Sequence, residues 1–126
     1  MILPASTEIG APNESTLLPS TGARLDELDI TPREIALDGG FQPGPVAENL
    51  PLPDRLFIAG RKSAGSRKTN RRLAKFRVGC EGRISHLKHR CGWSRTLIDG
   101  AHGAAIWCGH GIFAHNLAKI TALANR

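Results

Sequence analysis

The stretch LAKFRVGCEGRISHLKHRC, residues 73–91, decides how this sequence is expected to fold. Its apolar residues recur at steps of 3, 4, 4, 3 and 4, which is the spacing of one face of an amphipathic helix. The six positions are Leu73, Phe76, Cys80, Ile84, Leu87 and Cys91. The pattern predicts a helix of about 25 residues between Ser66 and Gly92, with these side chains facing the core.

The charged residues of this predicted helix form two further strips. At about 100° per residue, Arg77 and Lys88 lie beside Glu81 at the edge of the apolar face. Four other cations lie on the side away from the core: Arg72, Lys75, Arg83 and Arg90. The helix is therefore expected to carry an apolar strip, a mixed strip around Glu81 and a basic strip.

Charge is distributed very unevenly along the chain of 126 residues, whose formal net charge is +6. Residues 1–60 hold three basic and nine acidic residues, whereas residues 61–95 hold twelve basic residues and one acid, Glu81. A block this basic is typical of a surface that faces a polyanion, most often nucleic acid. A solvated helix face that only keeps the protein soluble is an equally good interpretation of the composition.

Upstream of the long helix, the pattern indicates a β-α-β unit. Residues 1–32 are rich in Pro, Ser, Thr and Gly, which favours loop, with a short helix over 21–28. The apolar runs at 35–37 and 56–59 each end at turn-forming residues, which is typical of short buried strands. A helical turn over 46–50 separates them, so a parallel pair of strands is expected.

A second helix is predicted from Gly103 to the end of the chain. Its positions recur at steps of 4, 3, 4, 3 and 4 through Ile106, His110, Phe113, Leu117, Ile120 and Ala124. Trp93 and Trp107, near and within it, are expected to be packing residues. The chain is thus predicted to be α/β, with a loop-rich segment over 1–32 and one domain over 33–126.

The cysteines and the apolar runs bear on compartment and metal binding. Three cysteines, an odd number, fit a reduced chain better than a disulfide framework. The order C-x5-H-x2-H-x-C, from Cys80 to Cys91, does not match the usual zinc spacings, so core cysteines and DNA-facing histidines are expected instead. The first cation is Arg24, so a positively charged signal-peptide start is missing, and no apolar run approaches the roughly 18 residues of a membrane helix. A cytoplasmic protein is expected.

Glu81, the single acid of the basic segment, has two interpretations. It can be half of an i,i+4 ion pair with Arg77, worth a few tenths of a kcal/mol. Alternatively, it is a metal-binding carboxylate kept ionised by its neighbours. The second interpretation needs a partner acid at a strand end, and Asp38 after the 35–37 strand is the candidate. An Asp before two glycines is also a common turn former.

Four separate motifs resemble one protein family. Arg77, Glu81 and Lys88 have the R-x3-E-x6-K spacing of bacterial insertion-sequence DDE transposases. The segment ALDGGF with Asp38 is similar to the second catalytic Asp motif of that family. CEGRISHLKHRCGWSRTLIDG resembles the helix of the third acid and its connection, and IWCGHGIFAHNLAKI resembles the terminal helix. The resemblance extends from about Asn13 to the C-terminus.

The resemblance implies an RNase H-like α/β domain, of which this chain would form the C-terminal half: two strands, the helix of the catalytic Glu and a C-terminal helix. It implies that Asp38 and Glu81 hold divalent ions, Mg²⁺ or Mn²⁺, for cleavage and transfer of DNA strands. Arg77 and Lys88 would contact phosphates near the scissile bond. The implied partner is DNA at transposon ends, bound in a bacterial cytoplasm and nucleoid. A homo-oligomer, or a mixed oligomer with an intact transposase, fits the same resemblance.

Two departures from the family limit the expected activity. The family commonly has Tyr three residues before the motif Arg, where this chain has Ala74. A first catalytic Asp on an early strand is missing, because Asp26 and Asp29 lie in the polar stretch LDELD. The chain is therefore expected to be a transposase fragment that retains two acids, lacks independent catalysis and leaves a sheet edge unpaired.

Two alternatives remain open from the sequence. One is a non-catalytic basic DNA-binding protein in which Glu81 is only a structural ion pair. The other is a degenerate reading frame that does not fold stably.

Overall fold

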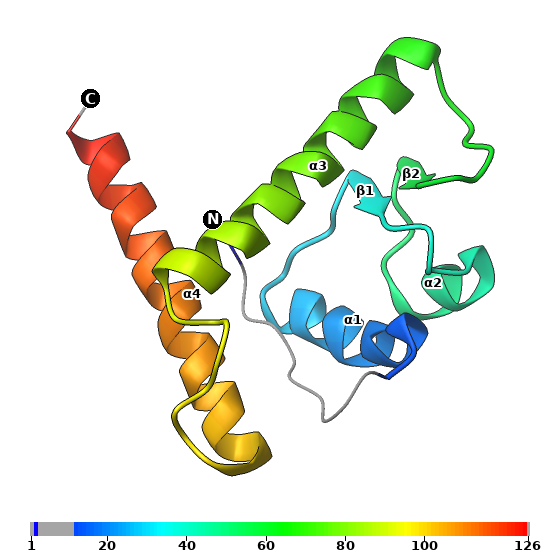
Figure 1. Ribbon diagram of the computed structural model, residues 1–126. Coiled ribbons are helices and arrows are strands. Elements are labelled where there is room, and N and C mark those ends of the chain that lie inside the picture. Colours follow the sequence, from blue (N-terminus) through cyan, green and yellow to red (C-terminus); the bar gives the residue numbers. More distant parts are fainter. Residues whose placement is uncertain (1, 3–11, 126) are drawn as a thin grey trace. The chain divides into compact units, whose positions relative to one another are not determined.

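The computed structural model describes residue 2 and residues 12–125. In chain order the elements are η1 (Glu14–Leu17), α1 (Leu18–Glu27), β1 (Glu34–Leu37), α2 (Pro43–Asn49), β2 (Arg55–Ile58), α3 (Arg67–Arg90) and α4 (Gly100–Ala124), as drawn in Figure 1. The chain divides into two compact units, Pro12–Glu81 and a unit that contains residues 82–125. The two units are described separately below.

The predicted β-α-β unit is confirmed in the Pro12–Glu81 unit. β1 and β2 pair in parallel, with Ile35 opposite Leu56 and Ala36 opposite Phe57. The connection between them contains α2, which begins with Pro43 at its first position, where a missing backbone N–H costs nothing. The fold class of α/β therefore holds for this unit, with a sheet of two strands.

The core of this unit lies on one face of the two strands, against α1 and α2. Its buried members are Leu18, Ile35, Val46 and Leu50. They come from α1, β1 and α2 with its C-cap, so their burial is what holds the two helices on the sheet. Helices α1 and α2 approach closely because α1 has Gly22 at the contact. A Cβ at that position would lie 2.0 Å from the carbonyl oxygen of Asn49.

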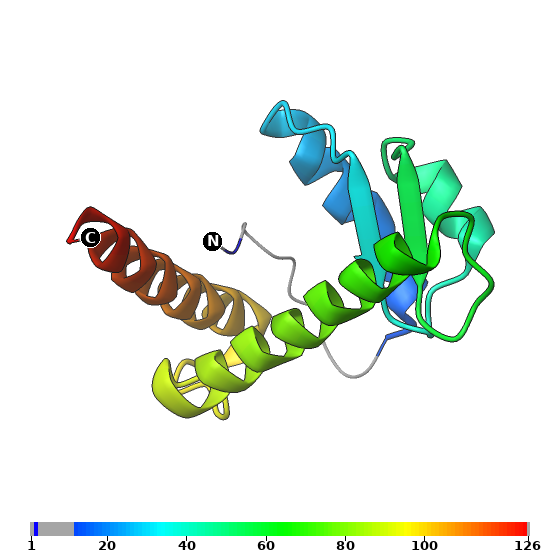
Figure 2. The same ribbon diagram turned by 90° about the horizontal axis from the view of Figure 1, so that it is seen from above.

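The opposite face of the strands is covered by the part of α3 that belongs to this unit (Figures 1 and 2). Successive side chains of a strand point to opposite faces, so Ile35 faces the core while Glu34 and Ala36 face α3. The carboxylate of Glu34 accepts hydrogen bonds from Arg72 of α3 and from Arg55 of β2. The unit is thus layered as helices, sheet and helix.

The apolar face of α3 is only partly buried, which corrects the prediction that all six positions face the core. Leu73 and Leu87 are buried, at 4% and 1% exposure. Phe76 and Ile84 are 55% and 47% exposed, and the two cysteines are half-buried. The sheet is too narrow to cover the helix. Its two strands lie about 5 Å apart, whereas a helix of the length of α3 extends over roughly 36 Å.

The face of α4 that packs also differs from the predicted one. Phe113 and Leu117, at the predicted apolar positions, are 68% and 51% exposed. The buried residues of α4 are Gly103, Gly111, Ile112 and His115. Because α4 carries a single charged side chain, Lys119, apolar spacing alone does not select a face. The buried face is the one that carries Gly103 and Gly111, because these glycines leave room for large neighbouring side chains.

Both tryptophans pack in the unit that contains residues 82–125, as expected. The indole of Trp93 donates to the carbonyl of Cys108 at 3.1 Å, and a Cβ at Gly111 would lie 2.3 Å from that indole nitrogen. The indole of Trp107 donates to the carbonyl of Gly92 at 2.8 Å. Gly92 itself has φ +76, a left-handed conformation that ends α3.

A histidine pair lies between α3 and α4 in the same unit. His115 is 4% exposed, and its ring meets the edge of His86 with 5.3 Å between the ring centroids. Burial lowers the pKa of His115 below its ordinary value, and the nearby His86 and Lys119 lower it further. The buried imidazole of His115 therefore favours its neutral form at neutral pH.

The cysteines and the helices bear on two further expectations. None of the three cysteines takes part in a disulfide, in line with the expected reduced chain. Over the residues that the structure describes, none of the helices combines the length and apolarity needed to cross a bilayer.

Candidate functional site

The structure brings the two predicted acids, Asp38 and Glu81, to one guanidinium group. Asp38 directly follows β1, and Glu81 lies on α3 one turn after Arg77. Nη1 of Arg77 is 2.5 Å from Oε1 of Glu81 and 3.4 Å from Oδ1 of Asp38. Arg77 is therefore the residue that connects a strand end to the helix, and we call these three residues the acid–arginine cluster.

Asp38 has its position because β1 ends in a tight turn. Its Oδ1 accepts a hydrogen bond from the backbone N–H of Gly39 at 2.7 Å, which is the behaviour of a turn-forming Asp. The turn is close to β2, since a Cβ at Gly39 would lie 3.1 Å from the carbonyl oxygen of Ala59. Asp38 thus both forms the turn and reaches toward α3.

The acid–arginine cluster is open to solvent on its acidic side. The side chains of Asp38 and Glu81 are 61% and 57% exposed, whereas that of Arg77 is 25% exposed. A half-buried cation between two exposed carboxylates offsets their mutual repulsion.

The donor chemistry of the cluster fits a hard divalent cation in part. Mg²⁺ prefers oxygen ligands and is commonly held by one or two carboxylates together with substrate phosphates. Asp38 and Glu81 supply two such carboxylates. No group of three His, Cys, Asp or Glu residues that could hold a metal ion occurs within residues 12–125 or at residue 2. A third carboxylate would have to come from outside the described part of the chain.

No family model, curated protein or solved structure matches this chain. Its chemistry therefore has to be inferred from its own residues.

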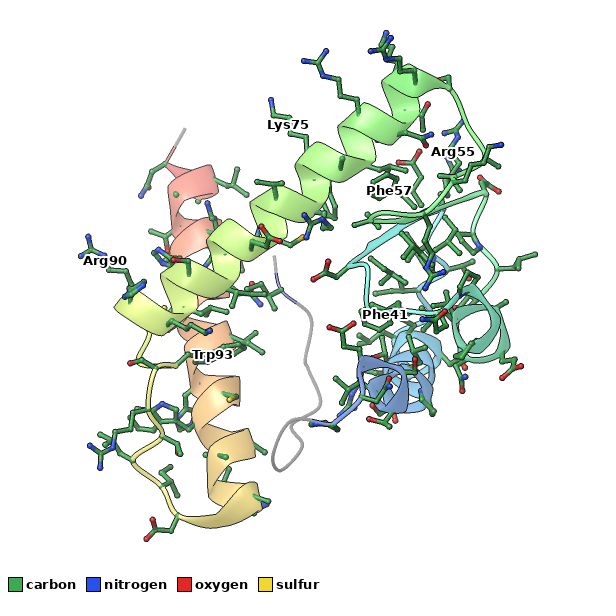
Figure 3. All side chains as sticks on the ribbon, turned by 45° about the vertical axis from the view of Figure 1, so that its right-hand side comes forward. Phe41, Arg55, Phe57, Lys75, Arg90 and Trp93 are labelled. Carbon is green, nitrogen blue, oxygen red and sulfur yellow. The ribbon has the colours of Figure 1, made fainter. Side chains whose placement is uncertain are left out.

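The predicted DNA-binding cations differ in what they contact. Lys75, Lys88 and Arg90 are exposed, and Figure 3 shows Lys75 on the side of α3 away from the strands, opposite Phe57. Lys88 and Arg90, like Arg83, lie in the unit that contains residues 82–125. Their exposure makes all of these side chains except the half-buried Arg83 accessible to a polyanion.

Arg72 is placed differently from the prediction. It was expected on the side of α3 away from the core, but its Nη2 lies 2.5 Å from Oε1 of Glu34 on β1. The long side chain of Arg allows its charged end to return to the sheet from the edge of the helix. Arg72 therefore fixes α3 to β1 and is less available for a polyanion than the exposed lysines.

The ion pairs of Glu34 predict an acid-sensitive contact between α3 and the sheet. Arg72, and then Arg55, lower the pKa of Glu34 from its usual 4.5 to about 2. Because the folded-state pKa is below the unfolded value, the pairs contribute fully above pH 4.5 and lose their contribution as the pH falls toward 2. We expect Arg72→Ala to move the pKa of Glu34 part of the way back to 4.5.

Carboxyl-detected NMR titration of Glu34 measures this shift directly. Lys75→Ala, which removes an exposed cation from the same helix, is the matched control and should leave the midpoint of Glu34 unchanged. A midpoint near 4.5 in the unaltered protein would show that the ion pairs do not form in solution.

One feature of the structure was not predicted from the sequence, a groove beside the N-terminal part of α3. Its volume is about 1180 Å³, and it lies within the Pro12–Glu81 unit. Its lining residues are Phe57, Gly65, Arg67, Lys68, Asn70, Arg71 and Ala74. The basic run at 67–71 is visible in the sequence, but its position beside Phe57 of β2 follows only from the packing of α3 on the strands.

Proposed function

We propose that this chain is a DNA-binding protein of the DDE transposase kind, in which Asp38 and Glu81 are two of the three carboxylates of a metal site. The observation that carries the proposal is the acid–arginine cluster, where a strand-end acid and a helix acid 43 positions later reach one guanidinium. The two carboxylates repel one another, and the positive charge of Arg77 offsets this repulsion as a bound divalent ion would.

The order of elements supports an RNase H-like half-domain. An acid-terminated strand, a second parallel strand and a long helix with an acid follow one another, as the resemblance implies. We infer that Asp38 and Glu81 provide oxygen ligands, and that Arg77 holds them in place until they bind their cation. Exposed cations of α3, such as Lys75, would contact DNA phosphates.

A divalent ion at such a site would activate a water or a DNA 3′-hydroxyl and stabilise the leaving oxygen. The residues of this chain position the acids and the phosphates around it. With two carboxylates in the described residues, catalysis is expected only when a third acid is supplied by another polypeptide segment.

Manganese-induced NMR relaxation tests the role of Glu81 without requiring activity. Titration with Mn²⁺ should selectively broaden the amide signals of Gly39 and Gly82, which directly follow the two acids. The Glu81→Gln variant should need about tenfold more Mn²⁺ for the same broadening, because one of two charged ligands is removed. Glu48→Gln, on α2, removes an equal charge away from the cluster and should leave the broadening unchanged.

The alternative function is a basic DNA-binding protein without a metal site. It is favoured by the ion pair itself, since Arg77 and Glu81 already satisfy one another at 2.5 Å. In that case, broadening by Mn²⁺ is unaffected by Glu81→Gln, and the substitution leaves duplex DNA binding unchanged or slightly tighter. Both functions predict salt-sensitive DNA binding, so the Mn²⁺ experiment is what separates them.

A further inference from the structure

The groove beside α3 combines positive charge with an apolar surface. Three cations line it, Arg67, Lys68 and Arg71, and each is exposed. Phe57 and Ala74 contribute its half-buried apolar part. In Figure 3, Phe57 lies on the side of α3 that faces the strands, and its half-buried side chain borders the groove. A ligand that fits this lining carries both a flat apolar ring and negative charge.

The groove cations, like the exposed Lys75, Lys88 and Arg90, form no ion pair in the described part of the chain, whereas two other cations of α3 do. Arg72 is paired with Glu34, and Arg77 with Asp38 and Glu81. No ion pair of Arg67, Lys68 or Arg71 is found in the part of the chain that the structure describes. Three cations gathered beside an aromatic ring without acids to neutralise them attract a polyanion.

The wall of the groove also holds an unmet hydrogen-bond acceptor. Oδ1 of Asn70 is buried, and no donor for it occurs among the described residues. Buried acceptors in native proteins nearly always have a partner. This oxygen has no exposed surface, so a base in the groove would donate to it only after the Asn70 side chain turned outward.

An unpaired nucleotide matches this lining better than duplex DNA does. In a duplex the base faces are stacked on one another, so only phosphates reach a protein groove and the apolar part stays unused. In a single strand the base is free to stack on an aromatic side chain while its phosphates meet cations. At about 1180 Å³ the groove is large enough for one nucleotide together with part of the adjoining strand.

We propose that this groove binds an unpaired nucleotide of single-stranded DNA, with the base against Phe57 and Ala74 and the phosphates at Arg67, Lys68 and Arg71. The inference rests on the proposed function in one respect, the choice of DNA as the polyanion. It adds a surface separate from the acid–arginine cluster, and it predicts that the protein distinguishes unpaired from paired DNA.

Fluorescence anisotropy with a labelled single-stranded oligonucleotide, and with a duplex of the same length, tests the proposal. The triple variant Arg67→Ala, Lys68→Ala, Arg71→Ala should bind the single strand at least about tenfold more weakly. The slope of log affinity against log salt concentration should also become smaller in magnitude by about 2. The matched variant Lys75→Ala, Lys88→Ala, Arg90→Ala removes the same charge outside the groove. It should weaken duplex binding while preserving the preference for the single strand.

An abasic oligonucleotide keeps every phosphate and removes the base, so it tests stacking on the unaltered protein. Its affinity should fall by about tenfold or more relative to the normal strand. Equal affinities for abasic and normal strands, together with equal losses in the two triple variants, would overturn the groove proposal while duplex binding remained. Failure to bind either form of DNA would overturn the proposed function as well.

Discussion

Replacing Gly22 by alanine is expected to destabilise the Pro12–Glu81 unit by about 2–3 kcal/mol, a large part of the stability of a small unit. The added Cβ would lie 2.0 Å from the carbonyl oxygen of Asn49, closer than any tolerated contact. That oxygen belongs to the backbone at the end of α2, so it cannot turn away as a side chain would. Helices α1 and α2 would have to separate, which exposes Leu18 and Val46 of the core.

Urea unfolding followed by circular dichroism measures this effect. Gly44→Ala is the matched control, because Gly44 lies on α2 and a Cβ there meets no atom within 4 Å. It is expected to change the stability by less than about 1 kcal/mol, because the gain from removing a helical glycine is opposed by the restriction on a residue before proline, here Pro45. Equal midpoints for the two variants would show that α1 and α2 do not pack as described.

Leu87→Ala is expected to destabilise the unit that contains residues 82–125 by about 2–5 kcal/mol. Leu87 is 1% exposed, the lowest value on α3. Its truncation removes buried apolar surface and leaves a cavity. Amide hydrogen exchange should become faster throughout α4, because the slowest amides of a unit exchange through its unfolding.

The comparison variant for this prediction is Leu123→Ala on α4. Leu123 is 64% exposed, so the same chemical truncation should cost less than about 1 kcal/mol. Leu87→Ala should also leave the exchange of β1 and β2 unchanged if the two units unfold independently. A loss of protection in both units would instead indicate one cooperative structure.

Local signals in the sequence predicted the elements well. The runs at 35–37 and 56–59 became β1 and β2, and the steps of three and four from Leu73 onward became α3. These signals are local because a strand or helix needs only its own apolar spacing and its turn residues. The parallel pairing followed as well, since two strands joined by a helix have few other ways to pair.

Packing was harder to predict from the sequence. Six positions of α3 have equivalent apolar spacing, but the number that is buried depends on the width of the sheet, which spacing does not encode. The buried face of α4 was missed for a related reason. Glycine contributes little to an apolar pattern in the sequence. Gly111 nevertheless determines which face of α4 packs, because it leaves room for the indole of Trp93.

The candidate site was predictable in part. Strand-end and helix positions placed Asp38 and Glu81 on elements that meet, and helical spacing placed Arg77 beside Glu81. The contact of Arg77 with Asp38, 39 residues away, required the structure. The groove required it too, because Phe57 and Arg67 come close only after α3 folds over β2.

The locations of Trp93 and Trp107 have a spectroscopic consequence. The chain contains two tryptophans and no tyrosine, and both indoles lie in the unit that contains residues 82–125. Each indole N–H donates to a backbone carbonyl, so unfolding of that unit transfers both rings to water and shifts their emission to longer wavelength. The Pro12–Glu81 unit has no such chromophore. Emission thus reports one unit, while far-ultraviolet dichroism reports both, and the chain carries its own label for separating the two transitions.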